Sequence, residues 1–395
     1  MRALVAWDNP AEAELLSLYL NLDAHRAVIT TKPAEFLELA GQESWDVILM
    51  ALNLPDLDGA FAILQRLRHL QPDCPIVGAC HPVEVFRLAR FLTHGMRSYL
   101  LRDSSGDFVF LVRSALEGAI EAVQAEREKQ IAERLREEIE SVRKLQESMI
   151  PYDFTCPEGY QACGRYEPSQ IQVLGGRPVV MAGGDYYDLF AMDERHLVIL
   201  VGDASGHGMK ACMSIFTMHT LVRMLRGQRY RDTAEFVSEI NRRLCEQGIL
   251  TANEGFITLL YGILDAQTHT FQWTSAGHPL PLLFSRDNGQ AARIGTSPDD
   301  TDLPLGLSAD TVYSSHRISI PASTRMLVYT DGLDEAFRHG EEHCKYGLDG
   351  VIRTLQRTAS RPLPEVLAAL FQDSFGFTQG AGRHDDTTVV LLERL

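Results

Sequence analysis

Short apolar runs alternate with helical periods over roughly the first 115 residues of the chain. The run DVILMAL at 46–52 carries no polar residue after its opening aspartate, which is typical of a strand buried on both faces. This order predicts an α/β, doubly wound domain in which helices cover both faces of a parallel sheet. Further strands are expected at 3–6, 28–31, 75–79 and 98–101, and helices at 12–22, 34–41, 60–70 and 83–94.

A long stretch without proline follows, from Val109 to Met149. Between 124 and 147 it is dominated by Glu, Arg, Lys and Gln, which favour helix. Its apolar positions recur at an alternating spacing of three and four, with Glu138 as the polar member of the seam. The apolar members are Ile131, Leu135, Val142, Leu145 and Met149. This pattern predicts a two-helix coiled coil, and hence a homodimer through residues 119–150. One amphipathic helix packed on its own domain is the alternative. Pro151 ends the helix.

Strands and glycine turns dominate the sequence from Tyr152 onward. Because strands and helices come in blocks, the pattern predicts an α+β domain with two β-sheets sandwiched by helices. The expected strands are 196–201, 256–264, 270–274, 280–284, 325–329 and 387–392, and the expected helices are 208–226, 233–246 and 364–371. The chain is therefore multidomain, with boundaries at 1–118, 119–151 (the helical coiled-coil linker) and 152–395.

The amino-acid composition indicates where the protein is located and which classes of partner it binds. The net charge of -16, from 37 basic and 53 acidic residues, disfavours nucleic-acid binding and suits a protein that binds divalent cations. The seven cysteines contain no CxxC pair, which indicates a reducing cytosol rather than a disulfide framework. We see neither a signal peptide nor an apolar run near the ~18 residues that a membrane span needs. We expect a cytoplasmic protein without a membrane partner.

Four short segments of the last domain place aspartates where an apolar strand meets a turn. They are GGD at 183–185, GDASGHG at 202–208, TDG at 330–332 and HDDTT at 384–388. Carboxylates on strand ends hold hard divalent cations, and two such ions ~4 Å apart clamp a phosphate and activate a water. One acidic-glycine pair is more often only a turn, but four of them together favour a metal site. The candidate residues that these segments supply are Asp185, Asp203, Asp331 and the adjacent Asp385 and Asp386.

These segments resemble the metal-dependent protein phosphatase family (protein phosphatase 2C type), in its sporulation-E-like, sigma-factor-regulating bacterial branch. The resemblance covers roughly 146–395 and includes FITLLYGILD, SAGHPLPLLF and LPLGL. It implies a serine/threonine phosphatase with two divalent ions, Mn²⁺ or Mg²⁺. It also implies a phosphorylated regulatory protein, such as an anti-sigma-factor antagonist, as the substrate. The metal ligands it implies are Asp185, Asp203, the Ala204 carbonyl, Asp331, Asp385 and, less directly, Asp386.

Two histidines of these motifs, His207 and His278, are interpreted as turn residues rather than general acids. Ser205 has no base nearby in sequence, so we do not expect it to be a nucleophile.

The first domain resembles the response-regulator receiver, on the run DVILMALNLPDLDG, yet the residues of its chemistry are replaced. Ala51 stands at the phosphoacceptor position, and Trp7 replaces one of two acids, leaving Asp8. Cys80 holds the switch hydroxyl position and Arg102 the lysine position. An alanine methyl cannot accept a phosphoryl group, and a lone carboxylate binds magnesium poorly. This degenerate site predicts a pseudo-receiver that signals through protein contact, without phosphorylation.

The segment KLQESMIP at 144–151 resembles the helix that enters the phosphatase domain in sigma-regulating relatives. A coiled coil with discrete registers is a plausible two-state element for coupling the two ends of the chain. The alternative function is a non-catalytic adaptor that binds partners through both domains. The selective loss of carboxylates in the first domain alone favours the enzyme.

Overall fold

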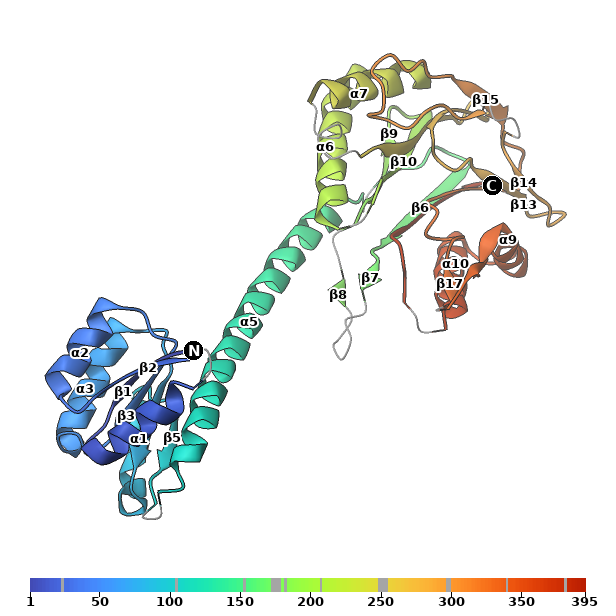
Figure 1. Cartoon of the computed structure of the whole chain (residues 1–395). Helices are drawn as coiled ribbons and strands as arrows, with labels where there is room; N and C mark the ends of the chain where they lie inside the picture. The colour runs from blue at the N-terminus through green and yellow to red at the C-terminus, as the bar shows by residue number, and fades with distance from the viewer. Residues whose placement is uncertain are drawn as a thin grey trace. The chain divides into compact units, whose positions relative to one another are not determined.

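The computed structural model describes residues 1–22, 25–103, 106–151, 154–171, 179–180, 183–206, 208–247, 255–295, 300–338, 340–379 and 382–395. The chain divides into two compact units, Met1–Leu135 and Arg136–Leu395, both shown in Figure 1. Within the described residues, no helix has both the length and the apolar composition that a bilayer span requires.

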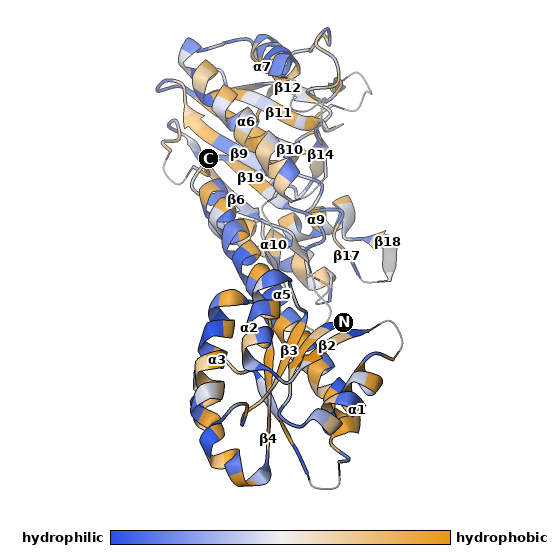
Figure 2. Cartoon of the chain, turned by 60° about the vertical axis from the view of Figure 1, so that its left-hand side comes forward, coloured by the Kyte–Doolittle hydropathy of each residue, from blue (hydrophilic) through white to orange (hydrophobic). Residues whose placement is uncertain are grey.

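The first unit contains a parallel five-stranded sheet in the order β2-β1-β3-β4-β5. The strands are β1 (Arg2–Ala6), β2 (Arg26–Thr30), β3 (Val47–Ala51), β4 (Ile76–Cys80) and β5 (Ser98–Leu101). The helices α1 (Pro10–Leu20), α2 (Pro33–Gln42) and α3 (Leu57–Leu70) connect them. Every residue of β3 is buried, and its apolar colour stands out in Figure 2. The predicted doubly wound fold is confirmed.

The predicted helix at 83–94 is divided in the structure. A 3₁₀ helix, η1 (Pro82–Arg87), precedes the short α4 (Leu88–Thr93). No residue of η1 is buried, and Val83 and Phe86 are both 76% exposed. An apolar period without a core to pack on does not stabilise a regular α-helix, because most helical stability in proteins comes from tertiary packing.

The predicted long helix is present as α5 (Val109–Glu147), which begins in the first unit and ends in the second. Its first turns bury Val112 and Leu116 in the core of the first unit. The middle of the helix is mostly hydrophilic, as Figure 2 shows. Seam positions Ile131 and Leu135 are 60% and 58% exposed. The helix starts ten residues before the predicted linker boundary at 119, since its first turns belong to the core.

The second unit is a sandwich of two antiparallel five-stranded sheets with helices on the outer faces (Figure 1). The first sheet, β15-β12-β11-β10-β9, is covered by α6 and α7, and the second, β14-β13-β16-β19-β6, by α9 and α10. The first set comprises β9 (Asp185–Ala191), β10 (His196–Ala204), β11 (Ile257–Asp265), β12 (Thr270–Ala276), β15 (His316–Ser319), α6 (Met209–Leu225), η2 (Arg226–Gln228) and α7 (Thr233–Gln247). The second set comprises β6 (Tyr160–Glu167), β13 (Leu282–Ser285), β14 (Ala291–Arg293), β16 (Thr324–Tyr329), β19 (Thr387–Arg394), α9 (Gly347–Arg357) and α10 (Leu363–Phe377). Two short pairs complete the unit: β7 (Gln170–Ile171) with β8 (Val179–Val180), and β17 (Phe337–Arg338) with β18 (Glu341–Lys345).

This sandwich confirms the predicted α+β architecture, although the hydrophobic pattern misses several elements: the short strands β7, β8, β14, β15, β17 and β18, and also β6, β9 and α9. The strand β6 lies at a sheet edge and is mostly half-buried, so it lacks a continuous apolar run. The strand β9 contains two aspartates, and α9 contains two glycines, both of which weaken the local signal.

Candidate functional site

Two of the predicted acids lie opposite each other at one end of the first sheet. The strand β9 begins at Asp185 and the neighbouring β10 ends at Ala204. The two strands are antiparallel, and Asp185 pairs with Asp203 in their register. Because residues directly opposite in such a pair point to the same face, the structure brings together carboxylates from two separate motifs.

The second sheet brings its own acids to the same end of the sandwich. The strand β16 ends just before Thr330 and Asp331, while Asp385 lies just before β19. The Thr330 hydroxyl donates to the Asp185 carboxylate at 2.7 Å and accepts the N–H of Thr388 at 2.8 Å. This bridge joins the two sheets at the predicted site.

The electrostatics show that the acids form one cluster. Burial, then the charges of Asp203 and Asp386, raises the pKa of Asp185 well above its ordinary range. Burial, then Asp331, Asp385 and Asp386, raises the pKa of Asp203 to about 8. Burial, then Asp385, raises the pKa of Asp331 to about 6. Carboxylates that repel one another in this way are what a bound divalent cation stabilises.

The donor set fits a hard cation, because every predicted ligand supplies oxygen. A side chain at Gly184 would bring its Cβ within 2.7 Å of the Ala204 carbonyl oxygen and 3.4 Å of an Asp203 oxygen. Glycine at this position therefore keeps open the space onto which both predicted donors face. Among the described residues, no three His, Cys, Asp or Glu side chains already converge closely enough to hold one ion. The structure thus shows a gathered set of donors rather than a closed coordination sphere.

Asp386 has a different environment from the other acids. Its two carboxylate oxygens accept the N–H groups of Ser169 at 2.7 Å and Gly184 at 2.5 Å. A Cβ at Gly332 would come within 1.9 Å of the Asp386 carbonyl, so this loop also packs tightly. These contacts occupy both carboxylate oxygens of Asp386 and favour a structural role for it, while one oxygen of Asp385 accepts the Asp386 N–H at 2.8 Å.

Sequence analysis did not single out Gln146, although it lies in the quoted segment KLQESMIP. This buried side chain in the last turn of α5 donates to the carbonyls of Gly183 at 3.1 Å and Asp185 at 3.2 Å. Its amide oxygen accepts the Gly183 N–H at 3.0 Å. An uncharged amide among charged and apolar neighbours was the only signal in the sequence. The end of α5 is therefore bonded directly to the backbone that carries the first acid.

Three further polar residues of the motifs, Ser205, His207 and His278, are not members of the acidic cluster. Ser205 accepts the N–H of Phe256 through its hydroxyl at 2.9 Å, which is a structural contact. His207 falls outside the described residues. His278 is buried after β12, and its contacts are described below.

In the first unit, the predicted degenerate receiver positions form a filled acidic pocket. The Arg102 guanidinium, only 2% exposed, donates to Asp8 at 2.5 Å and Glu12 at 2.7 Å. It also lies over the ring of Trp7, whose Nε1–H donates to Glu12 at 2.8 Å. Asn53 donates to the second oxygen of Asp8. The arginine thus supplies the positive charge that these acids require.

The other two receiver positions are apolar in character. Ala51 is fully buried at the end of β3 and offers no acceptor for a phosphoryl group. Cys80 is buried at the end of β4, and burial raises the pKa of its thiol to about 11. It is therefore a neutral thiol at physiological pH.

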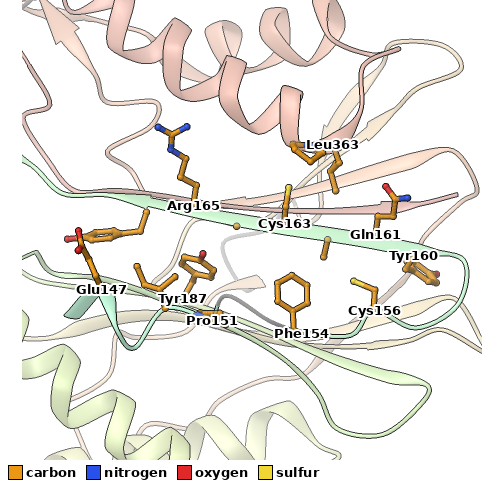
Figure 3. A pocket seen from close by; sticks show the side chains of 15 residues that line it. Glu147, Pro151, Phe154, Cys156, Tyr160, Gln161, Cys163, Arg165, Tyr187 and Leu363 are labelled. Atoms are coloured by element: carbon orange, nitrogen blue, oxygen red, sulfur yellow. The ribbon is translucent and has the colours of Figure 1, made fainter. Parts of the chain in front are cut away.

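A cavity of about 690 Å³ lies along the free edge of β6, and none of the clustered acids lines it (Figure 3). Cys163 and Arg165 point to the side of Leu363, whereas Phe154 and Cys156 lie on the other side of the strand (Figure 3). A smaller cavity of about 220 Å³ borders Asp385. We place the chemistry at the acidic cluster, because charge rather than cavity size decides where a cation binds.

Comparison with known proteins agrees with this geometry. The profile of the family described as Stage II sporulation protein E (SpoIIE) matches residues 193–395, just over half of the chain. The chain belongs to the SpoIIE family. Residues 3–109 match the response regulator receiver domain, so a receiver precedes the SpoIIE region.

Individual relatives of this SpoIIE-family chain are distant. Protein IcfG of Synechocystis sp. is 22% identical over 284 residues, which are 66% of this chain and 42% of that protein. Phosphoserine phosphatase RsbP of Bacillus subtilis is 28% identical over 154 residues, 38% of this chain and 36% of that protein. The chain thus spans less than half the length of either relative. The SiaA-PP2C domain of Pseudomonas aeruginosa has a similar fold, with a TM-score of 0.52, 19% identity and coverage of 69% of this chain and 99% of that domain.

Proposed function

We propose that this chain is a protein serine/threonine phosphatase whose acidic cluster binds two divalent ions, Mn²⁺ or Mg²⁺. The observation that carries the proposal is the gathering of Asp185, Asp203, Asp331 and Asp385 at one end of two sheets. Membership of the SpoIIE family supports it. When bound, such ions lower the pKa of a water and neutralise charge on a transferring phosphoryl group.

The chain's own residues prepare the site in three ways. The Thr330 hydroxyl fixes one oxygen of Asp185, so this carboxylate keeps a single orientation. The glycine at 184 exposes the Ala204 carbonyl as a neutral donor beside Asp203. The fourth carboxylate, Asp385, belongs to the lining of the small cavity, which a substrate could enter.

We propose a phosphoserine or phosphothreonine on a regulatory protein as the substrate. RsbP, a relative of this chain, is described as a phosphoserine phosphatase, which supports this class. The cavity beside Asp385 is also lined by Phe337 and His384, whose rings stack at 3.9 Å between centroids. This flat surface suits contact with a segment that flanks the phosphorylated residue. As an example of such a substrate we propose an anti-sigma-factor antagonist. We propose the cytoplasm as the location of the protein.

Control of the phosphatase is proposed to come from the first domain without phosphorylation. Ala51 offers no acceptor, and Arg102 already fills the acidic pocket of the pseudo-receiver. A homodimer would cover Ile131 and Leu135, which the heptad seam leaves exposed. Gln146 then links the end of the same helix to the Asp185 backbone, so a change in helix register would reach the acidic cluster.

The test is turnover of phosphoserine and phosphothreonine peptides by the full-length protein, with Mn²⁺, with Mg²⁺ and with chelator. We expect metal-dependent release of phosphate that is lost in Asp331→Ala, and retained in Asp310→Ala, which changes an exposed acid outside the cluster. Absence of turnover in the full-length protein and after deletion of residues 1–118 would contradict the proposal and favour a non-catalytic adaptor.

A further inference from the structure

His278 is held in one position by the loop that follows β12. Its imidazole is buried, with 2% of the residue exposed. The backbone N–H of His278 donates to the Ser275 hydroxyl at 3.2 Å, and the backbone N–H of Gly277 donates to the Thr301 hydroxyl at 3.1 Å. Gly277 has a φ of +69°, and a Cβ there would come within 2.5 Å of Pro304. The loop therefore accepts only glycine before the histidine, and the ring has little freedom to move.

One ring nitrogen contacts β11, the strand that pairs with the Asp203 end of β10. The Nδ1 atom of His278 lies 2.9 Å from the hydroxyl of Thr258, in β11. In the antiparallel register, Thr258 lies directly opposite Asp203. Such opposed residues have their Cβ atoms roughly 5 Å apart on one face of the sheet. The imidazole therefore supports the immediate neighbour of a clustered acid.

The other ring nitrogen faces the second sheet. Nε2 is buried and, among the described residues, has no hydrogen-bond partner of ordinary geometry. The backbone carbonyl of Tyr329 favours a proton on the ring, and since Nδ1 contacts Thr258, we assign this interaction to Nε2. Tyr329 is the last residue of β16 and lies two positions before Asp331. The imidazole thus lies between β11, which pairs with the strand that carries Asp203, and the end of β16, which leads to Asp331.

The protonation state of the ring follows from its surroundings. Burial lowers the pKa of His278 to about 3, so the ring is neutral at working pH. A neutral imidazole has one donor and one acceptor nitrogen. Because Nε2 faces a carbonyl, it carries the proton, and Nδ1 accepts a hydrogen bond from the Thr258 hydroxyl.

We infer that His278 is a positioning residue that spans the two sheets and sets the separation between Asp203 and Asp331. The inference rests on the proposed function, in which these two carboxylates hold metal. A residue that only fills space would be replaceable by an apolar side chain of similar volume. A positioning residue needs a polar atom at each end, so the two roles predict different outcomes for matched substitutions.

The test is Mn²⁺ binding by calorimetry to the full-length protein, which requires no turnover. Outer-shell partners of metal ligands typically alter affinity about 10- to 100-fold. We therefore expect His278→Leu to weaken Mn²⁺ binding at least about tenfold, and His278→Gln, which keeps a donor and an acceptor, to recover a large part of the loss. Thr258→Val should resemble His278→Leu, and the double variant should be little worse than either single one, because both remove one interaction.

Two controls separate positioning from a general loss of packing. His316→Leu removes a half-buried histidine that stacks on Trp273 and whose Nε2 also has no hydrogen-bond partner within the described part of the chain, and it should leave Mn²⁺ affinity unchanged. Unfolding midpoints in chelator report whether each variant is folded. If His278→Leu is not folded, His278→Gln and Thr258→Val still decide the question.

The outcomes are distinct. The inference would be overturned if folded His278→Leu bound Mn²⁺ as tightly as the wild type. It would also be overturned if the losses of affinity from His278→Leu and Thr258→Val added up in the double variant. Either result would leave the proposed function intact. Failure of the wild-type protein itself to bind Mn²⁺ would overturn the proposed function and this inference with it.

Discussion

Replacing Asp203 by Asn should stabilise the metal-free protein at alkaline pH while removing its affinity for metal. Asp203→Asn keeps the shape of the side chain and removes one charge from a cluster of like charges. The pKa of Asp203 is raised from its ordinary value of 3.8 to about 8, by burial and by Asp331, Asp385 and Asp386. At about 1.4 kcal/mol per pKa unit, a rise of this size corresponds to roughly 6 kcal/mol.

The direction with pH follows from proton binding in the two states. Between pH values near 4 and near 8, the folded protein holds a proton on Asp203 that the unfolded chain has released. The free energy of unfolding therefore falls as pH rises through this window. Because the neighbouring carboxylates share the repulsion, we expect Asp203→Asn to gain about 2–4 kcal/mol at pH 8.5, and several-fold less at pH 5.

The assay is urea unfolding in chelator, followed by the fluorescence of Trp273. The other two tryptophans, Trp7 and Trp45, lie in the first unit, so replacing both by Phe isolates the signal of the second unit. Asp310→Asn, an exposed acid outside the cluster, should change stability by less than about 0.5 kcal/mol. With Mn²⁺ present the order should reverse, because only the wild-type protein gains binding energy. An Asp203→Asn variant that is no more stable than wild type at pH 8.5 in chelator would refute the reasoning.

Three further predictions concern contacts outside the carboxylates. Arg102→Met should destabilise the first unit by about 2–3 kcal/mol in urea unfolding, because the partly buried Asp8 and Glu12 lose their cation. As a control, Arg90→Met breaks an exposed ion pair with Asp58 and should cost under about 1 kcal/mol. Equal losses in the two variants would contradict the account. Gln146→Leu removes three hydrogen bonds to the backbone of Gly183 and Asp185, so we expect turnover of an aryl phosphate to fall at least about tenfold. Unchanged turnover would show that this contact does not order the site. Introducing charge through the double variant Ile131→Lys and Leu135→Lys should convert a dimer into a monomer by light scattering, and an unchanged mass would remove the coiled coil from the proposal.

Much of this architecture is predictable because its signals are local. The all-apolar run that forms β3 indicated a buried parallel strand, and the structure places it at the centre of such a sheet. Asp203 lies near the end of an apolar strand, which the local pattern predicts, and Asp185 lies beside two glycines that mark a turn, although β9 itself is not predicted.

The contacts that were not predicted are those between residues far apart in sequence. Asp386 accepts N–H groups from Ser169 and Gly184, which lie 217 and 202 positions away, and no local pattern distinguishes this role from metal binding. Gln146 reaches a loop 37 positions along the chain. Arg102 was identified as a replaced lysine, but its pairing with Glu12 depends on how the sheet brings two loops together. Weak edge strands such as β6 were missed for a related reason, since their burial is set by neighbours rather than by their own residues.

The most direct test of the central claim is hydrolysis of an aryl phosphate by the purified full-length protein across a Mn²⁺ titration, beside Asp385→Asn. The account predicts turnover that appears with Mn²⁺, disappears in chelator and is lost in the variant, whose fold remains intact. Turnover that persists in chelator or in Asp385→Asn would contradict the assignment of the acidic cluster as a metal-dependent phosphatase site.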